Sequence, residues 1–275
     1  MSKKDNNQAA PVGTSKRAQL AAQQAAEAAH KRMMRIVTVI GIVLALVIVS
    51  IVTVVLVQNH EKDPGTTETT AETTAEQIVP VRANADGNGI VYHESTKNTD
   101  APLVDAYLDY QCPGCAAASR IIDPMLEELA DNGSIQLVYH TLHGLDARLK
   151  NDSSYRSAIA ATCVANLDTD YFPTYSSTIF ANQPRREGIG YTNEQLTKTF
   201  TESAGITGAD LETFQACYTG QATKDFIDTT QKTLPDVVTL TPSFVTNNKV
   251  LDLNEQNLAS KEALLEAIKQ AAGQD

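Results

Sequence analysis

The sequence has few basic residues for its length. Its 275 residues include 22 lysines and arginines against 33 aspartates and glutamates, which gives a formal net charge of −11. This balance argues against nucleic-acid binding, which needs a positively charged surface. The chain also has only four cysteines, and none lies near the end of the long apolar segment in its N-terminal part, so a lipoprotein-type anchor is not indicated.

Residues 36–57 contain no charge at all. These 22 residues are enough to cross roughly 30 Å of hydrocarbon as a single helix. Seven basic and two acidic residues precede them, and a basic flank favours a cytoplasmic N terminus with the rest of the chain outside. The run is longer than the apolar part of a cleaved signal peptide, and no small-x-small cleavage site follows it. We therefore expect residues 1–35 to be a cytoplasmic basic tail and residues 36–57 an uncleaved transmembrane signal-anchor.

The segment after the apolar run has a centre without large apolar side chains. Its centre, residues 66–76, contains only threonine, glutamate and alanine, and such a composition cannot build a core. We expect a flexible tether over residues 58–85 and one domain over residues 86–275. A coil of that length reaches roughly 30 Å, which would keep the domain close to the membrane.

The domain alternates strand and helix patterns and then changes character. A helix expected over residues 116–130, kinked by Pro124, lies between two strands, and this order predicts a right-handed strand-helix-strand unit. Residues 153–232 read almost entirely as helices, and a last helix is expected over residues 261–271. The expected strands are residues 89–93, 102–108, 134–140, 242–246 and 249–251. We infer an α/β fold in which a block of helices interrupts a mixed sheet.

Cys112-Pro113-Gly114-Cys115 stands where the second strand gives way to a helix. At the N terminus of a helix, unpaired N–H groups and the positive end of the dipole favour a thiolate. A thiolate at Cys112 can attack a disulfide, and the thiol of Cys115 can then resolve the mixed disulfide. We take Cys112 as the candidate nucleophile and Cys115 as the candidate resolving cysteine.

Two motifs are informative together, the run from Asp109 to Cys115 and the segment Thr241-Pro242-Ser243-Phe244-Val245. Together they resemble thioredoxin-fold proteins of the DsbA type, in particular the membrane-anchored versions of Gram-positive actinobacteria. The resemblance covers about residues 86–275. It implies a thioredoxin fold with a helical subdomain inserted at about residues 152–233 and preceded by one transmembrane helix. It also implies that Thr241-Pro242 forms a cis-proline loop facing the active site, where the backbone of Thr241 pairs with a substrate segment.

The sequence departs from this family at two places. Family members commonly carry a buried acid six residues before the first cysteine, and here that position is Ala106. Strand alternation points its neighbour Asp105 to the opposite face, so proton transfer has to use Asp109, water or another group, and no general base is assigned. The dipeptide Pro113-Gly114 replaces the Pro-His of strongly oxidising relatives, which predicts a less oxidising disulfide.

The remaining cysteines and two histidines suggest structural roles. Cys163 and Cys217 could be two buried free thiols, but in an oxidising compartment we expect them to form a structural disulfide, worth about 4 kcal/mol on the chain-entropy model. A redox relay to the active site is a minor alternative. His140 and His143 could be combined with the active-site cysteines into a zinc site, but zinc-module spacings differ. We expect no metal and no cofactor.

Three functions remain in competition. The first is an oxidase that donates the Cys112-Cys115 disulfide to newly exported cysteine-containing proteins and is regenerated by a membrane redox partner. The second is a reductase or isomerase kept reduced by a membrane electron carrier. Isomerases of this fold usually add a dimerisation domain, whereas the segment before this domain reads as a tether, so a monomeric oxidase is favoured. The third is a non-catalytic peptide-binding module that uses the groove near Pro242.

Overall fold

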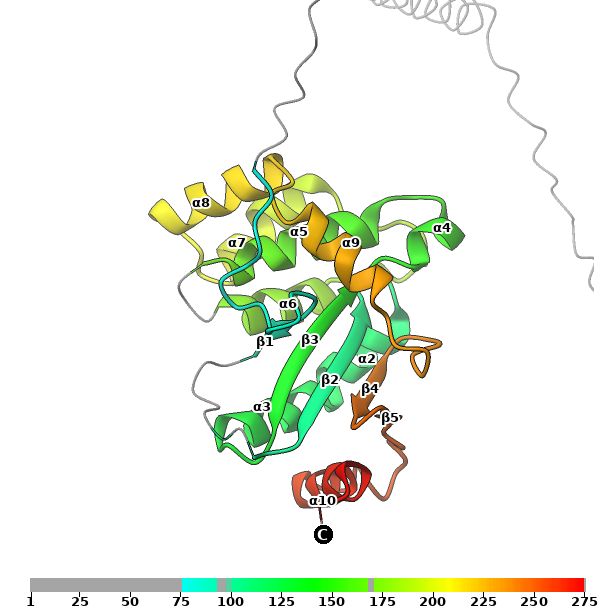
Figure 1. Cartoon of the computed structure of the whole chain (residues 1–275). Helices are drawn as coiled ribbons and strands as arrows, with labels where there is room; N and C mark the ends of the chain where they lie inside the picture. Colours follow the sequence, from blue (N-terminus) through cyan, green and yellow to red (C-terminus); the bar gives the residue numbers. More distant parts are fainter. Residues whose placement is uncertain (1–75, 93–97, 99, 168–170, 275) are drawn as a thin grey trace, which may run out of the picture. The chain divides into compact units, whose positions relative to one another are not determined.

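The computed structural model describes residues 76–92, 98, 100–167 and 171–274 (Figure 1). The expected cytoplasmic tail, the expected transmembrane span and most of the expected tether lie outside these residues. In the part of the chain that is described, no helix combines the length and the apolar character needed to cross a bilayer.

A five-stranded mixed sheet forms the centre of the domain, in the order β1-β3-β2-β4-β5. The central pair, β2 and β3, is parallel, and the other neighbours are antiparallel. In the register, Ala106 lies opposite Tyr139 on one side and Phe244 on the other. Because β2 is covered on both faces, most of its residues are apolar and buried. The strands are β1 (Ile90–Val91), β2 (Leu103–Asp109), β3 (Gln136–Leu142), β4 (Ser243–Thr246) and β5 (Lys249–Val250).

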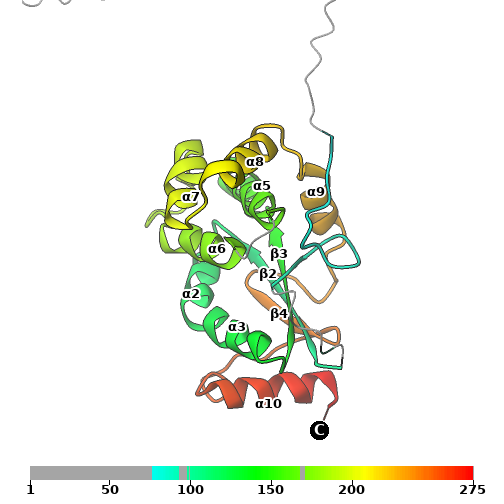
Figure 2. The same cartoon turned by 90° about the vertical axis from the view of Figure 1, so that its left-hand side faces the viewer.

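The connection from β2 to β3 consists of two helices, α2 (Pro113–Ile121) and α3 (Asp123–Asp131). The expected strand-helix-strand unit is therefore present, but the single helix expected over residues 116–130 is broken at Ile122. Pro124 lies in the first turn of α3, where a missing N–H costs nothing and the residues before it are pushed out of regular helix. Figure 2 shows the two helices following one another along one face of the sheet.

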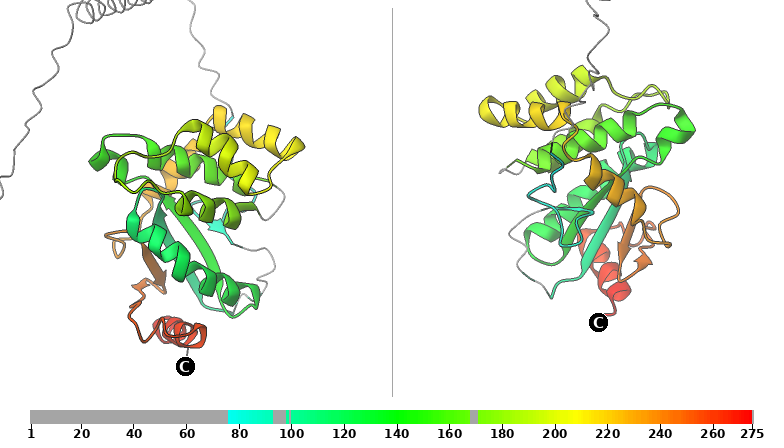
Figure 3. Two further views of the ribbon diagram at one scale, coloured as in Figure 1. Left: turned by 180° about the vertical axis from the view of Figure 1, so that it is seen from behind. Right: turned by 45° about the horizontal axis from the view of Figure 1, so that its top comes forward.

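Helices fill the chain between β3 and β4, and they gather beyond the end of the sheet where β2 and β3 finish (Figures 1 and 3). The short helix α4 was not expected from the sequence, and the segment around residue 195 is a π-helix rather than an α-helix. The last helix, α10 (Lys261–Ala272), packs against α3 and β4. The helices of the block are α4 (Leu145–Leu149), α5 (Ser153–Ala165), α6 (Tyr171–Ala181), η1 (Gln195–Thr199), α7 (Phe200–Ser203), α8 (Gly208–Thr219) and α9 (Lys224–Lys232).

The folded region begins earlier than the boundary expected at residue 86. The backbone N–H of Ile78 donates to the carbonyl of Ala222 over 2.8 Å, Pro80 is buried, and Ala83 forms a β-bridge with Ile90. The Thr/Glu-rich composition ends before these residues, and their apolar side chains have a core to join. The segment from residue 77 onward is thus part of the domain rather than of the tether.

Candidate active site

The Cys112-Pro113-Gly114-Cys115 segment joins the end of β2 to the first turn of α2. Cys112 has extended backbone dihedrals and is the N-cap residue, and Pro113 begins the helix, a position that proline favours because no N–H is needed there. The N–H of Cys112 donates to the carbonyl of Asp109 over 2.9 Å and closes the turn. Cys112 keeps 8% of its surface exposed, whereas Cys115 has none, so Cys112 is the thiol that a substrate can reach.

The surroundings shift the pKa values of the two thiols in opposite directions. A hydrogen bond with Cys115 lowers the pKa of Cys112 to about 5, with help from Thr241 and from the backbone N–H groups of Gly114 and Cys115, although burial opposes it. Burial raises the pKa of Cys115, and the adjacent charge on Cys112 adds to this effect. At neutral pH the pair therefore holds a thiolate on Cys112 and a proton on Cys115, the arrangement needed for attack and later resolution.

The second sequence motif lies directly against the first. The Thr241-Pro242 peptide bond is cis, as the resemblance implied. Sγ of Cys112 lies 3.2 Å from the carbonyl oxygen of Thr241, to which the protonated thiol donates a hydrogen bond. Gly114 permits this approach, because a Cβ at that position would lie 3.0 Å from Cδ of Pro242. The absence of a side chain at Gly114 thus leaves room for the proline loop close to the active-site turn.

An open groove of about 250 Å³ adjoins the cysteine pair. Asp109 and Thr241 line its inner end, and most of the remaining lining is aliphatic, with Leu142, Leu234 and Leu240 among it. Leu240 is a large apolar side chain, yet it is 65% exposed. The groove offers an apolar surface beside Thr241, whose carbonyl oxygen lies 3.2 Å from Sγ of Cys112.

Asp109 is the carboxylate nearest in sequence to the cysteine pair, and it is buried at the end of β2. Its Oδ1 accepts hydrogen bonds from the N–H of Gln111 over 2.9 Å and from Oγ of Ser154 over 2.6 Å, and its Oδ2 accepts from the N–H of Leu145 over 3.1 Å. Burial raises its pKa to about 6 despite these bonds. Its own N–H donates to Sγ of Cys115 over 3.5 Å. The backbone and the side chain of Asp109 therefore both form hydrogen bonds with residues of the active-site turn.

Asp105 and the two histidines are engaged elsewhere. Oδ1 of Asp105 lies 2.9 Å from Nε2 of His140, and Nδ1 of His140 lies 2.8 Å from the carbonyl oxygen of Asn88. The ring of His143 packs edge-on against Tyr155, with 4.9 Å between centroids. In the described part of the chain, no group of three or more His, Cys, Asp and Glu side chains is arranged to hold a metal ion.

The helical block braces the active-site turn through residues that sequence reasoning missed. Nε2 of Gln183 donates to the carbonyl oxygens of Tyr110 and Cys112 over 2.9 and 3.1 Å. The hydroxyl of Tyr191 also donates to the carbonyl of Tyr110, over 3.1 Å. These partners lie more than 70 residues away from the turn, and no motif in the sequence marks them.

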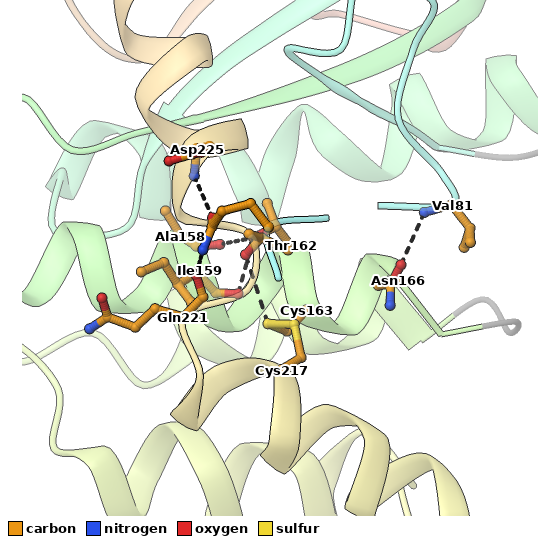
Figure 4. Close-up of a disulfide and its surroundings, with 11 residues drawn as sticks. Val81, Ala158, Ile159, Thr162, Cys163, Asn166, Cys217, Gln221 and Asp225 are labelled. Atoms are coloured by element: carbon orange, nitrogen blue, oxygen red, sulfur yellow. Dashed lines mark hydrogen bonds between the residues drawn. A yellow bond between two sulfur atoms is a disulfide. The ribbon is translucent and has the colours of Figure 1, made fainter. Parts of the chain in front are cut away.

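Cys163 on α5 and Cys217 on α8 form a disulfide within the helical block (Figure 4). Cys163 is fully buried and Cys217 nearly so. Beside the bridge, the hydroxyls of Thr162 and Thr223 are hydrogen bonded over 2.7 Å. The pairing expected from the sequence is therefore present, and it ties together two helices whose cysteines are separated by 54 positions.

Three solved structures share this arrangement of elements. MdbA, a thiol-disulfide oxidoreductase from Corynebacterium diphtheriae, is 20% identical, with 73% of this chain and 99% of that chain covered and a TM-score of 0.55. Oxidised DsbA from Mycobacterium tuberculosis is 22% identical over 70% of this chain and 91% of that chain, with a TM-score of 0.50. Oxidised BdbD from Bacillus subtilis is 20% identical over 72% of this chain and 100% of that chain, also with a TM-score of 0.50.

These similarities establish a DsbA-like fold and confirm, at the level of the fold, the resemblance inferred from the two motifs. No curated protein matches the chain. A family model described as thioredoxin matches residues 97–270. The match runs from before β2 through the cysteine pair and the helical block into the last helix, which is more than half of the sequence, and the chain therefore belongs to the thioredoxin family.

Proposed function

We propose that the protein is a thiol-disulfide oxidoreductase that donates the Cys112-Cys115 disulfide to other proteins. The opposite pKa shifts of the two thiols carry this proposal. A thiolate on Cys112 that is stabilised well below the usual pKa of a cysteine makes the reduced form more stable. A disulfide whose reduced form is stabilised is an oxidant, so donation to a substrate is the favoured direction.

The reaction follows from the accessibility of the two sulfurs. A substrate thiolate attacks Sγ of Cys112, the disulfide bond breaks, and the sulfur of Cys115 leaves with the electron pair and takes up a proton. A second substrate thiolate then attacks the mixed disulfide and releases Cys112 as a thiolate. Because Cys112 is the lower-pKa thiol, it is also the better leaving group in this step.

The substrate proposed is an unfolded, cysteine-containing segment of a newly exported protein. The aliphatic groove beside Thr241 can accept an apolar side chain next to the substrate cysteine. In an extended segment, backbone groups can pair with the loop at Thr241 while the side chains enter the groove. A folded protein would not offer such a segment.

The location proposed is the outer face of a cell membrane, with the domain held by residues 36–57 and tethered by the Thr/Glu-rich segment. The uncharged run and its basic flank support this placement. A membrane redox partner would then restore the Cys112-Cys115 disulfide after each transfer. Residues 1–35 would remain in the cytoplasm.

The reduction potential separates the oxidase from the reductase. The full-length chain in detergent micelles is equilibrated in glutathione buffers, and free Cys112 thiol is quantified by alkylation. We expect roughly −120 to −180 mV, the range of strong thiol oxidants, whereas about −270 mV would identify a reductase.

Trapping separates the enzyme from a peptide-binding module. The Cys115→Ser variant is expected to accumulate mixed disulfides with exported proteins, and Cys112→Ser is the matched control that should form none. The proposal would be contradicted if the wild type and the variant that carries both Cys112→Ser and Cys115→Ser bound peptides equally well and neither formed covalent adducts.

A further inference from the structure

A second buried carboxylate lies behind the cysteine pair, and the reaction described above does not use it. Asp123 is the first residue of α3 and is 7% exposed. Its Oδ1 is buried and has no hydrogen-bond partner among the described residues. Leaving a buried carboxylate oxygen unpaired is costly unless the group is neutral or in contact with water, so this side chain needs an explanation.

The side chain of Asp123 lines a cavity of about 180 Å³ whose walls are partly polar and partly apolar. Ser119, Glu127 and Ser176 contribute polar groups to the same cavity, and the hydroxyl of Tyr139 donates to Oε1 of Glu127 over 3.2 Å. The volume far exceeds the roughly 15 Å³ that one water needs, and the lining supplies the polar partners that a buried water requires. The cavity can therefore hold a hydrogen-bonded path from Asp123 to its less buried end at Glu127.

Ser119 links the cavity to the helix that carries the resolving cysteine. Cys115 and Ser119 lie one turn apart on α2, and Asp123 follows Ser119 by four residues across the break at Ile122. All three are buried. A helical path of eight residues is about 12 Å long, too far for direct proton transfer, and Ser119 lies between the two ends in the sequence. The buried hydroxyl of Tyr110 is within electrostatic range of both Asp123 and Cys115, and it bonds to Oγ of Ser176 over 3.0 Å.

We infer that Asp123 is the proton store for Cys115, acting through Ser119, Tyr110 and water in the cavity. It is thus a positioning residue that takes the part of the acid missing at Ala106. The inference rests on the proposed function. When a substrate thiolate attacks Cys112, the Cys112-Cys115 bond breaks and the sulfur of Cys115 leaves with the electron pair. The carboxylic acid of Asp123 supplies the proton through the relay and becomes a carboxylate, and solvent returns a proton by way of Glu127.

The charged and titratable groups around Asp123 are consistent with a neutral resting state. Burial and the charge of Glu127 raise its pKa to about 7, against a lowering effect of Ser119. Burial raises the pKa of Glu127 to about 6. The neighbouring strand offers Tyr139, whose pKa is raised mainly by burial, and α6 contributes no charged group to the cavity lining.

Asp109 is the competing carboxylate, and its surroundings differ in one respect that decides between them. Both oxygens of Asp109 accept hydrogen bonds, three in all, and each of these bonds favours the charged acceptor. Oδ1 of Asp123 accepts none among the described residues. A group that must gain and lose a proton in every cycle is better served by the second environment.

The test compares the rates at which dithiothreitol reduces the oxidised full-length chain in detergent micelles, followed by acid quench and alkylation between pH 5 and 9. After correction for the thiolate fraction of dithiothreitol, the wild-type rate should fall above about pH 7, where Asp123 loses its proton. Asp123→Asn should lower the plateau on the order of 10²-fold and abolish this inflection. Ser119→Ala, which leaves the carboxyl intact, should slow the reaction and keep the inflection. Glu212→Gln, an exposed change on α8, should match the wild type.

The outcomes distinguish this inference from the proposed function. If Asp109→Asn removes the inflection and Asp123→Asn does not, Asp109 is the proton store and the inference is wrong. The carboxyl carbon of Asp123, titrated by NMR, should change its pKa between the reduced chain and its Cys115→Ala variant, a readout that needs no turnover. An unchanged titration would also overturn the inference. A potential near that of thioredoxin would remove the oxidase proposal but leave the coupling of Asp123 to Cys115 measurable.

Discussion

Sγ of Cys112 lies 3.2 Å from the backbone carbonyl oxygen of Thr241, within hydrogen-bond distance for the protonated thiol, although 129 positions separate the two residues. Cys112 is the N-cap of α2, just after the central strand ends at Asp109, and Thr241 precedes the cis peptide bond that leads into β4. The contact brings the reactive sulfur and the proline loop to one place, beside the aliphatic groove that Thr241 also lines.

The low pKa of Cys112 is predicted to depend on the side chain of Cys115, which is its largest stabilising partner. Cys115→Ala should raise the pKa of Cys112 by about one unit or more, seen as a shift in the pH profile of iodoacetamide alkylation. Cys115→Ser keeps a hydroxyl donor and should shift the profile less. Identical profiles for both variants and the wild type would mean that the helix N terminus alone stabilises the thiolate.

The stability of the reduced protein relative to the oxidised one should rise with pH. The folded-state pKa of Cys112, about 5, lies below its ordinary value of 9.0, so its stabilisation is present at high pH and is lost as pH falls through about 5. Between pH 5 and 8 the difference in free energy of unfolding should grow by up to about 1.4 kcal/mol per pH unit. Urea titrations of both redox forms measure it. A flat difference would contradict the depressed pKa.

Gly190 is predicted to be indispensable for the support of the active-site turn. Its φ is +66°, and a Cβ there would lie 2.5 Å from Ser153, whose hydroxyl accepts from the N–H of Tyr191 over 2.8 Å. Gly190→Ala should lower the free energy of unfolding by about 3 kcal/mol. Gly205 also has a positive φ but open space around it, so Gly205→Ala should cost only about 1 kcal/mol. Equal losses in chemical denaturation would show that the contact with Ser153 is unimportant.

The Cys163-Cys217 disulfide is predicted to stabilise the helical block without taking part in exchange. Replacing both cysteines by alanine should lower the free energy of unfolding by about 4 kcal/mol, given the 54-position loop. The rate of Cys112 alkylation should not change. Among the described residues, no hydrogen bond joins the bridge to the active-site turn. A matching loss of Cys112 reactivity in the folded variant would favour the redox relay instead.

The sequence alone determined the chemistry of the site. The strand pattern before Cys112, Pro113 at the first helical position and the helix after it are local features, and local backbone preferences suffice to place a thiol at a helix N terminus. The pairing of Cys163 with Cys217 followed from counting cysteines. The order of strands and helices also followed from periodicity. The exceptions are the division of one expected helix into α2 and α3, the short helix α4, the π-helical segment and the folding of residues 77–85 onto the domain.

Tertiary structure alone decided which distant groups control those thiols. Gln183 and Tyr191 reach the active-site turn from the helical block, and Asp123 lies buried at the start of α3 with an unpaired oxygen. In the sequence, each is an ordinary polar residue in a helical or loop segment. Burial, hydrogen-bond satisfaction and pKa depend on which atoms meet after folding, and long-range packing sets those encounters. The reactive residues can therefore be read from local sequence, whereas the environment that tunes them exists only in the folded chain.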